Sequence, residues 1–340
     1  MASKDRCVVL TPYRIRIKRR GKDSFVPLDE LPGSHGFYRV FKSFVTNQMK
    51  PYAPRCDDNS ESGDPEKVHV DHEAKTAVSI LDVHDHPSSP VDVSKWTDVF
   101  FELGEYGVAC TLLNTETLQS RMKESHEASL FPFYARLDMR AKSDVGLLVF
   151  QEYGRPTAAG EVCRRLRAHF NLNPDYESYT LRLEPLVPAS YLQEMQDGRL
   201  TKIRLFRKLR PHDTVEELTG DSSQDRIGSL EVVYHAPRGR GFAAVSGWLS
   251  RFMSSPETWS KYVAFDDSLE YERAKVEVKF GKKTRTLDLV RKNGPLAYAR
   301  IDVSPELKFD ENSKHPTMDS VRETVGNYMY DLFQEIGWTP

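Results

Sequence analysis

The stretch from Asp144 to Pro211 constrains the fold more than any other part of the chain. The apolar run Val145–Phe150 is short and bounded by polar residues, which predicts a strand. Ala158–Phe170 repeats apolar residues at helical spacing, which predicts an amphipathic helix. Tyr179–Leu183 and Leu200–Leu205 alternate as half-buried strands do, with a short helix expected between them.

The fold class follows from the order of these elements. Strands dominate the first 137 residues, and strands and helices alternate after them. This order predicts an α+β protein of mostly antiparallel sheets with helices packed on one face, in two or three subdomains. We expect an N-terminal domain over 1–137 with an acidic loop at 50–66, a central domain over 138–235, and a C-terminal hairpin and helix region over 236–340.

Three local patterns add detail. Tyr13–Lys18 alternates apolar with basic residues, which predicts a strand with one basic face, most simply an edge strand. Leu118–His126 has a helical pattern. Pro316–Trp338 repeats apolar residues at helical spacing and predicts a terminal helix. Because its stripe is too apolar to face water, we expect that helix to dock domains or to form a dimer.

The cysteines and the hydropathy indicate a reducing, cytoplasmic setting. Cys7, Cys56, Cys110 and Cys163 are far apart and form no CxxC pair. Cys110 and Cys163 lie in apolar patterns and are expected to be buried thiols. The N-terminus lacks the apolar core of a signal peptide, and no apolar window is long enough to span a membrane.

The small net charge of −2 hides strong segregation. Residues 1–22 carry eight Lys and Arg against one Asp, and residues 273–292 carry eight against two acids. The total charge therefore does not exclude a nucleic-acid partner.

The last strand of the organising stretch leads into a basic run between Arg199 and Arg210 that no acid interrupts. Such a run suits contact with nucleic-acid phosphates. A basic turn, RGRGF, follows at 238–242, and a predicted hairpin over 270–290 has a basic tip. The alternative is that these tips are only solvated and that the acids of 213–225 fold back on the basic edge. The expected contacts with the backbone of double-stranded DNA are Arg199, Lys202, Arg204, Arg207, Lys208, Arg210, Arg238, Arg240, Lys282, Lys283 and Arg285.

Four histidines, interleaved with aspartates, invite a metal hypothesis because imidazole and carboxylate together suit zinc, iron or manganese. They are His69, His72, His84 and His86. Residues 87–90 contain two prolines, which favour a loop, so we expect a surface hairpin and loop without a metal.

The sequence contains no phosphate loop, dinucleotide fingerprint, nucleophile elbow or kinase motif, and no cofactor is expected. Glu277-Val278-Lys279 has the E-x-K spacing of many metal-dependent nucleases. Such an enzyme also needs an acid on a preceding strand, for which Asp267 and Glu270 are available.

The central stretch resembles the RexA family of phage exclusion proteins. The resemblance lies in FPFYARL at 131–137, VGLLVFQEYGRPTAAGEV at 145–162, LRLEPLVP at 181–188 and GRLTKIRLF at 198–206. It implies a cytoplasmic, dimeric, DNA-binding sensor of phage infection that acts through a membrane protein encoded nearby. We therefore expect a non-enzymatic DNA-binding protein of a phage-defence system. A metal-dependent nuclease using Glu277 and Lys279, or a protein–protein adaptor of a defence complex, remains the alternative.

Overall fold

A computed structural model describes residues 7–32, 36–47, 68–86, 94–153, 158–188, 191, 198–208, 229–237, 273–280, 283–291 and 295–338. The chain divides into two compact units, called unit 1 and unit 2 below. Unit 1 comprises Met1–Val8, Tyr13–Glu184 and Glu306–Asn327. Unit 2 comprises Val9–Pro12, Pro185–Pro305 and Tyr328–Pro340.

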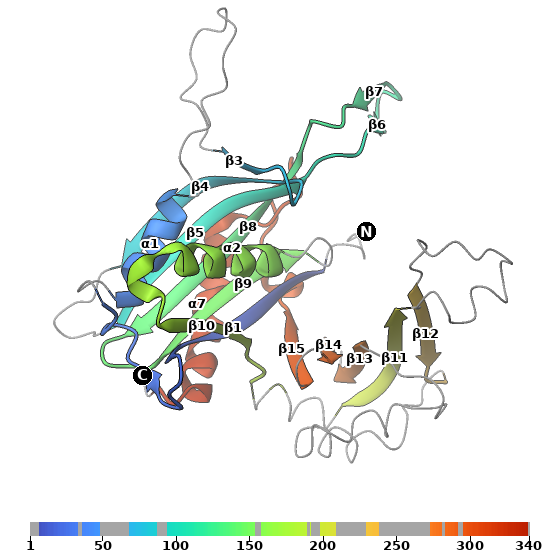
Figure 1. The fold of residues 1–340 in the computed structure, drawn as a ribbon. Coiled ribbons are helices and arrows are strands. Elements are labelled where there is room, and N and C mark those ends of the chain that lie inside the picture. Colours follow the sequence, from blue (N-terminus) through green and yellow to red (C-terminus); the bar gives the residue numbers. More distant parts are fainter. Residues whose placement is uncertain are drawn as a thin grey trace, which may run out of the picture. The chain divides into compact units, whose positions relative to one another are not determined.

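The sheet of unit 1 is formed by β1 (Val8–Arg19), β2 (Phe25–Val26), β3 (Val68–Asp71), β4 (Thr76–His86), β5 (Ser94–Glu105), β8 (Ser129–Arg140), β9 (Val145–Tyr153) and β10 (Tyr179–Pro185). The strands lie in the order β10-β1-β9-β8-β5-β4-β3, with β2 also paired to β1 (Figure 1). The pairs from β9 to β3 are antiparallel. All nine residues of β9 are buried, because this apolar strand lies between β1 and β8.

Two helices cover one face of this sheet, α1 (Gly36–Asn47) and α2 (Ala158–Leu172). Phe41 and Val45 of α1 and Val162 of α2 face Val99 and Ala135 of the sheet. The elements β1, α1, β8, β9, α2 and β10 follow the split βαβ order of ferredoxin-like folds. Strands β3, β4 and β5 are inserted after α1 and extend the sheet beyond β8.

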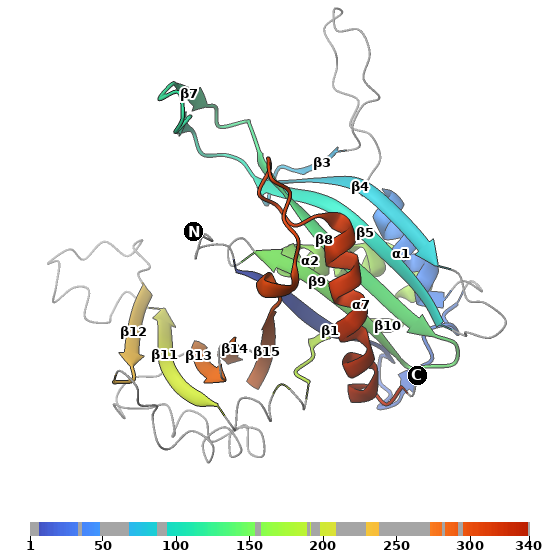
Figure 2. The same ribbon diagram turned by 180° about the vertical axis from the view of Figure 1, so that it is seen from behind.

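The third helix, α7 (Met318–Glu335), begins in unit 1 and ends in unit 2. Its unit 1 part lies on the face of the unit 1 sheet opposite to α1 and α2 (Figures 1 and 2). There the Arg322 guanidinium lies over the ring of Phe100, at 5.2 Å from the centroid. Its apolar stripe, including Val321, Val325 and Met329, is buried within the chain. The α+β class with mostly antiparallel sheets is confirmed, with helices on both faces of the unit 1 sheet.

Unit 2 contains a second sheet, formed by β11 (Arg199–Lys208), β12 (Ser229–His235), β13 (Arg273–Phe280), β14 (Lys283–Arg291) and β15 (Pro295–Asp302). Its order is β12-β11-β13-β14-β15, and all four pairings are antiparallel (Figure 2). The Val9–Pro12 part of β1 pairs with β15. One face of the sheet is apolar and buried, through Leu205, Val276, Val278, Leu287 and Ala299.

Several local expectations were wrong. Residues 84–86 belong to β4 and do not form a loop. Residues 118–126 contain no helix, because β7 (Ser120–Lys123) pairs with β6 (Cys110–Leu113) in a hairpin. Cys110 is therefore exposed, whereas Cys163 is buried as expected. β1 is not an edge strand, because β9 and β10 both pair with it.

Strand β8 runs across residue 137, where a domain boundary was expected. Among the described residues, no helix is both long and apolar enough to cross a bilayer.

Candidate nucleic-acid interface

One face of the unit 2 sheet gathers charged residues from four strands. Lys202 of β11 lies opposite His235 of β12 and Glu277 of β13, and Arg204 lies opposite Lys275. Opposite residues of an antiparallel pair project from the same side of a sheet, so these positions share one face. We call it the charged face, and its described charged members are Arg199, Lys202, Arg204, Glu231, Lys275, Glu277, Lys279, Arg300 and Asp302.

The charged face and the apolar face arise from simple alternation. In β13 the sequence Lys275-Val276-Glu277-Val278-Lys279 alternates charge with valine, and both valines are fully buried. The period of two in a strand places the charges together on the other side. The hydroxyl of Tyr191 accepts a hydrogen bond from the Thr286 amide at 2.8 Å and donates to backbone oxygens of β14 and β15. This hydroxyl fixes the β14–β15 pair beside the charged face.

Acids from neighbouring strands neutralise part of the basic edge. Arg204 lies 3.4 Å from a carboxylate oxygen of Glu277 and 3.5 Å from one of Glu231. Lys202 lies 3.9 Å from Glu277. Along the chain no acid interrupts this run, but the sheet brings Glu231 and Glu277 in from both sides. The acids of 213–225, which the alternative interpretation folds back on the basic edge, lie outside the described residues.

At one end of the charged face, two cations occupy directly opposite positions. Arg199 at the start of β11 pairs with Lys279 near the end of β13, and both residues are exposed. Two exposed cations thus lie side by side at this end of the face, an arrangement that can contact an anion.

For the other predicted contact residues, the structure describes either the backbone alone or nothing. The backbones of Arg207 and Lys208 continue β11, opposite Leu230 and Ser229 of β12. Lys283 and Arg285 lie in β14 by their backbones. The remaining ones, Arg210, Arg238, Arg240 and Lys282, lie outside the described residues.

Sequence reasoning missed four members of the charged face, Glu231, Lys275, Arg300 and Asp302. The alternation of charge and valine in β13 was the signal that would have found Lys275. Nothing along the chain indicates Arg300, because β15 reaches the face only through its pairing with β14.

The nuclease alternative gains little from this geometry. Glu277 and Lys279 share the charged face, as E-x-K requires. However, the Glu277 carboxylate already lies beside Lys202 and Arg204, whose charges compete with a metal ion for it. The supporting acids Asp267 and Glu270 lie outside the described residues.

A second polar cluster lies in unit 1, beneath α7. Asp98 of β5 is fully buried and accepts a hydrogen bond of 2.6 Å from the Tyr134 hydroxyl. Its other carboxylate oxygen lies 3.3 Å from Arg322 Nε and 3.4 Å from His86 Nε2. Burial, together with the charge of Asp98, raises the pKa of Tyr134 well above its usual range. The cluster thus fastens α7 to the sheet through charge.

Three histidines of the metal hypothesis each have a separate partner. His84 Nε2 lies 2.5 Å from Asp82, the His86 ring stacks on Trp96, and His72 shares a hydrogen bond with the Tyr106 hydroxyl. The side chain of His69 lies outside the described part of the structure. Within the described ranges, no three His, Cys, Asp or Glu side chains are grouped so that they could hold a metal ion. The absence of a metal stays a prediction.

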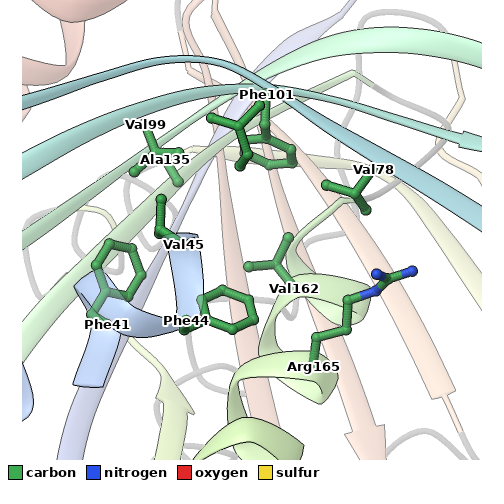
Figure 3. A pocket seen from close by; sticks show the side chains of 10 residues that line it. Phe41, Phe44, Val45, Val78, Val99, Phe101, Ala135, Val162 and Arg165 are labelled. Carbon is green, nitrogen blue, oxygen red and sulfur yellow. The ribbon is translucent and has the colours of Figure 1, made fainter. Parts of the chain in front are cut away.

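Between the unit 1 sheet and its two helices lies a small apolar cavity of about 30 Å³ (Figure 3). Phe41, Phe44, Val162 and Ala135 are among the side chains that line it, and Arg165 lies at its edge. The volume is close to that of one water molecule, so this is a packing defect rather than a ligand site.

Comparison with known proteins finds no family model and no curated protein that matches this chain.

Proposed function

We propose that this protein binds nucleic acid through backbone phosphates on the charged face of unit 2, and that it does not cleave it. The observation that carries the proposal is the direct pairing of Arg199 with Lys279 across β11 and β13. The pairing places exposed cations of two neighbouring strands side by side, and a phosphate that bridged them would be held by charge-assisted hydrogen bonds.

The charge balance of the face points the same way. Its described cations are Arg199, Lys202, Arg204, Lys275, Lys279 and Arg300, and its described acids are Glu231, Glu277 and Asp302. Among these described side chains cations outnumber acids, although the whole chain carries −2. Contacts of this kind hold the backbone and read no bases, so binding would be independent of sequence.

The resemblance to RexA-type exclusion proteins supplies the biological part of the proposal. It favours double-stranded DNA as the nucleic acid and a sensor of phage infection as the role. A membrane protein encoded nearby would then be the effector. These points rest on the resemblance alone.

The test is the salt dependence of binding to a short duplex, for the wild-type chain and for Arg199→Gln with Lys279→Gln. Each lost phosphate contact releases one counterion fewer, so the slope of log affinity against log salt should fall by about 1–2. The loss should be similar for unrelated sequences. Lys308→Gln is the matched control, an exposed lysine of unit 1 that should leave the slope unchanged.

The outcome that overturns the proposal is an unchanged slope in the double variant. A wild-type chain that binds neither duplex DNA nor RNA at low salt would also overturn it. That result would favour the adaptor, whose basic and acidic surfaces meet other proteins.

A further inference from the structure

An open groove lies in unit 1, where the ends of three sheet strands meet the first turn of α2. It encloses about 450 Å³, a volume typical of sites for small ligands. Its described walls come from the β3–β4 turn, the start of β4, the end of β5, the start of β8 and α2. All of these elements belong to unit 1, so the groove is a site separate from the charged face of unit 2.

Strand pairing lines the groove with two rows of side chains. Thr76, Glu105 and Ser129 lie opposite one another across β4, β5 and β8. Leu103 lies opposite Phe131 in the next row on the same face, because side chains two positions apart in a strand project to one side. Leu103 is buried, whereas the large side chain of Phe131 remains 39% exposed. The groove therefore combines a polar row with an apolar row that contains an aromatic ring.

The wall formed by α2 is held rigid by its own network. Glu161 accepts hydrogen bonds from Arg164 and Arg165, both at 2.7 Å, and from the Thr76 hydroxyl at 3.2 Å. Arg165 also donates to the Thr76 hydroxyl at 2.6 Å. The charge of Glu161 is thus offset by two guanidinium groups, and the hydrogen bonds fix this wall before any ligand arrives.

The second acid of the groove, Glu105, has no such partners. It is exposed at the end of β5. In the part of the chain that the structure describes, its carboxylate makes neither an ion pair nor a hydrogen bond. The described residues that line the groove include no Lys, Arg or His. The charge that a ligand meets here is therefore the negative charge of Glu105.

We propose that this groove binds a small organic cation, an ammonium group carried on a short apolar body. The ammonium group donates charge-assisted hydrogen bonds to Glu105, and the apolar body lies on Phe131 and Leu103. The ring of Phe131 adds attraction, because the face of an aromatic ring carries partial negative charge. An anion of the same shape is repelled by Glu105.

Three ligands of similar shape and different charge test the proposal. Benzylamine is the cation, benzyl alcohol its neutral analogue and benzoate its anionic analogue. In ligand-observed NMR titrations at low salt, the wild-type chain should bind benzylamine in the millimolar range and benzyl alcohol more weakly. Benzoate should not bind.

Two variants assign the contacts. Glu105→Gln should weaken benzylamine binding about two- to fivefold and remove the preference for the amine over the alcohol. Phe131→Leu keeps an apolar side chain without the ring and should weaken benzylamine binding by a similar factor. Glu323→Gln, at an exposed acid of α7 in unit 1, is the matched control and should leave the affinity unchanged.

Thermal unfolding of each variant confirms that the chain is folded before its affinity is compared. Equal affinities of the wild-type chain for benzylamine and benzyl alcohol overturn the proposal. So does a wild-type chain that does not bind benzylamine, or a preference for the amine that survives Glu105→Gln. None of these measurements uses nucleic acid, so they are independent of the function proposed for the charged face.

Discussion

Arg204 of β11 and Glu277 of β13 form an ion pair of 3.4 Å across two neighbouring strands, and the same guanidinium lies 3.5 Å from Glu231 of β12. The two acids hold Arg204 in place on the charged face. They also compete with any phosphate for its charge.

The first prediction follows from that competition. Glu277→Gln removes an acid beside Lys202 and Arg204 and should strengthen duplex binding roughly two- to fivefold at low salt. The gain should shrink as salt rises, because screening weakens both attraction and repulsion. Fluorescence anisotropy with a labelled duplex measures both effects.

The same variant separates binding from cleavage. If Glu277 held a catalytic metal, magnesium-dependent cutting by the wild-type chain would be lost in Glu277→Gln, and the binding proposal would be wrong.

The second prediction concerns Asp98, the buried carboxylate beneath α7. Asp98→Asn leaves Arg322 and His86 without their anion and weakens the bond from Tyr134, so it should lower the free energy of unfolding by about 1–3 kcal/mol. Asp319→Asn is the control, since Asp319 is 95% exposed and lies 3.5 Å from the same Arg322. Its effect should stay within about 0.5 kcal/mol in urea titrations. Equal losses in both variants would contradict the anchoring role of Asp98.

The third prediction concerns acid stability. Hydrogen bonds from Arg164, and then from Arg165, lower the pKa of Glu161 from 4.5 to about 2. The Glu161 carboxylate therefore binds a proton more readily in the unfolded chain than in the folded one. Its contribution to the free energy of unfolding is complete above pH 4.5 and is lost as the pH falls towards 2. Glu161→Gln should cost about 1–2 kcal/mol at neutral pH, less than the full shift implies because solvent screens Arg164.

The pH profile provides the check on that assignment. Unfolding free energies of wild type and Glu161→Gln, measured from neutral pH to pH 2, should converge as the pH falls. A constant difference across the range would show that Glu161 acts through packing and not through charge.

The fourth prediction uses the apolar cavity of about 30 Å³ in unit 1. Val162→Ile adds one methylene at its wall and should stabilise the protein by up to about 1 kcal/mol. Val149→Ile adds the same group at a fully buried position of β9 and should destabilise it by about 1 kcal/mol. Thermal unfolding of both variants gives the comparison, and two losses would mean that the cavity closes in solution.

Local elements could be read from the sequence because their signals are local. The apolar stripe of α7, the run of β9 and the alternation of β11 each lie within one segment, and all three appear close to the expected bounds. Local patterns failed where strand pairing overrides them. Residues 118–126 have helical spacing, yet Ser120–Lys123 pair with Cys110–Leu113 as a ribbon.

The sequence by itself determined which residues form most helices and strands, and that basic residues gather along β11. Only the tertiary structure decided what those basic residues face. Glu231 and Glu277 lie 27 and 73 positions after Arg204, and sheet pairing places both beside its guanidinium. Side-chain periodicity is a property of one segment, whereas the neighbours of a strand depend on register and order across the whole sheet. For that reason the pairing of Arg199 with Lys279 could not be found along the chain.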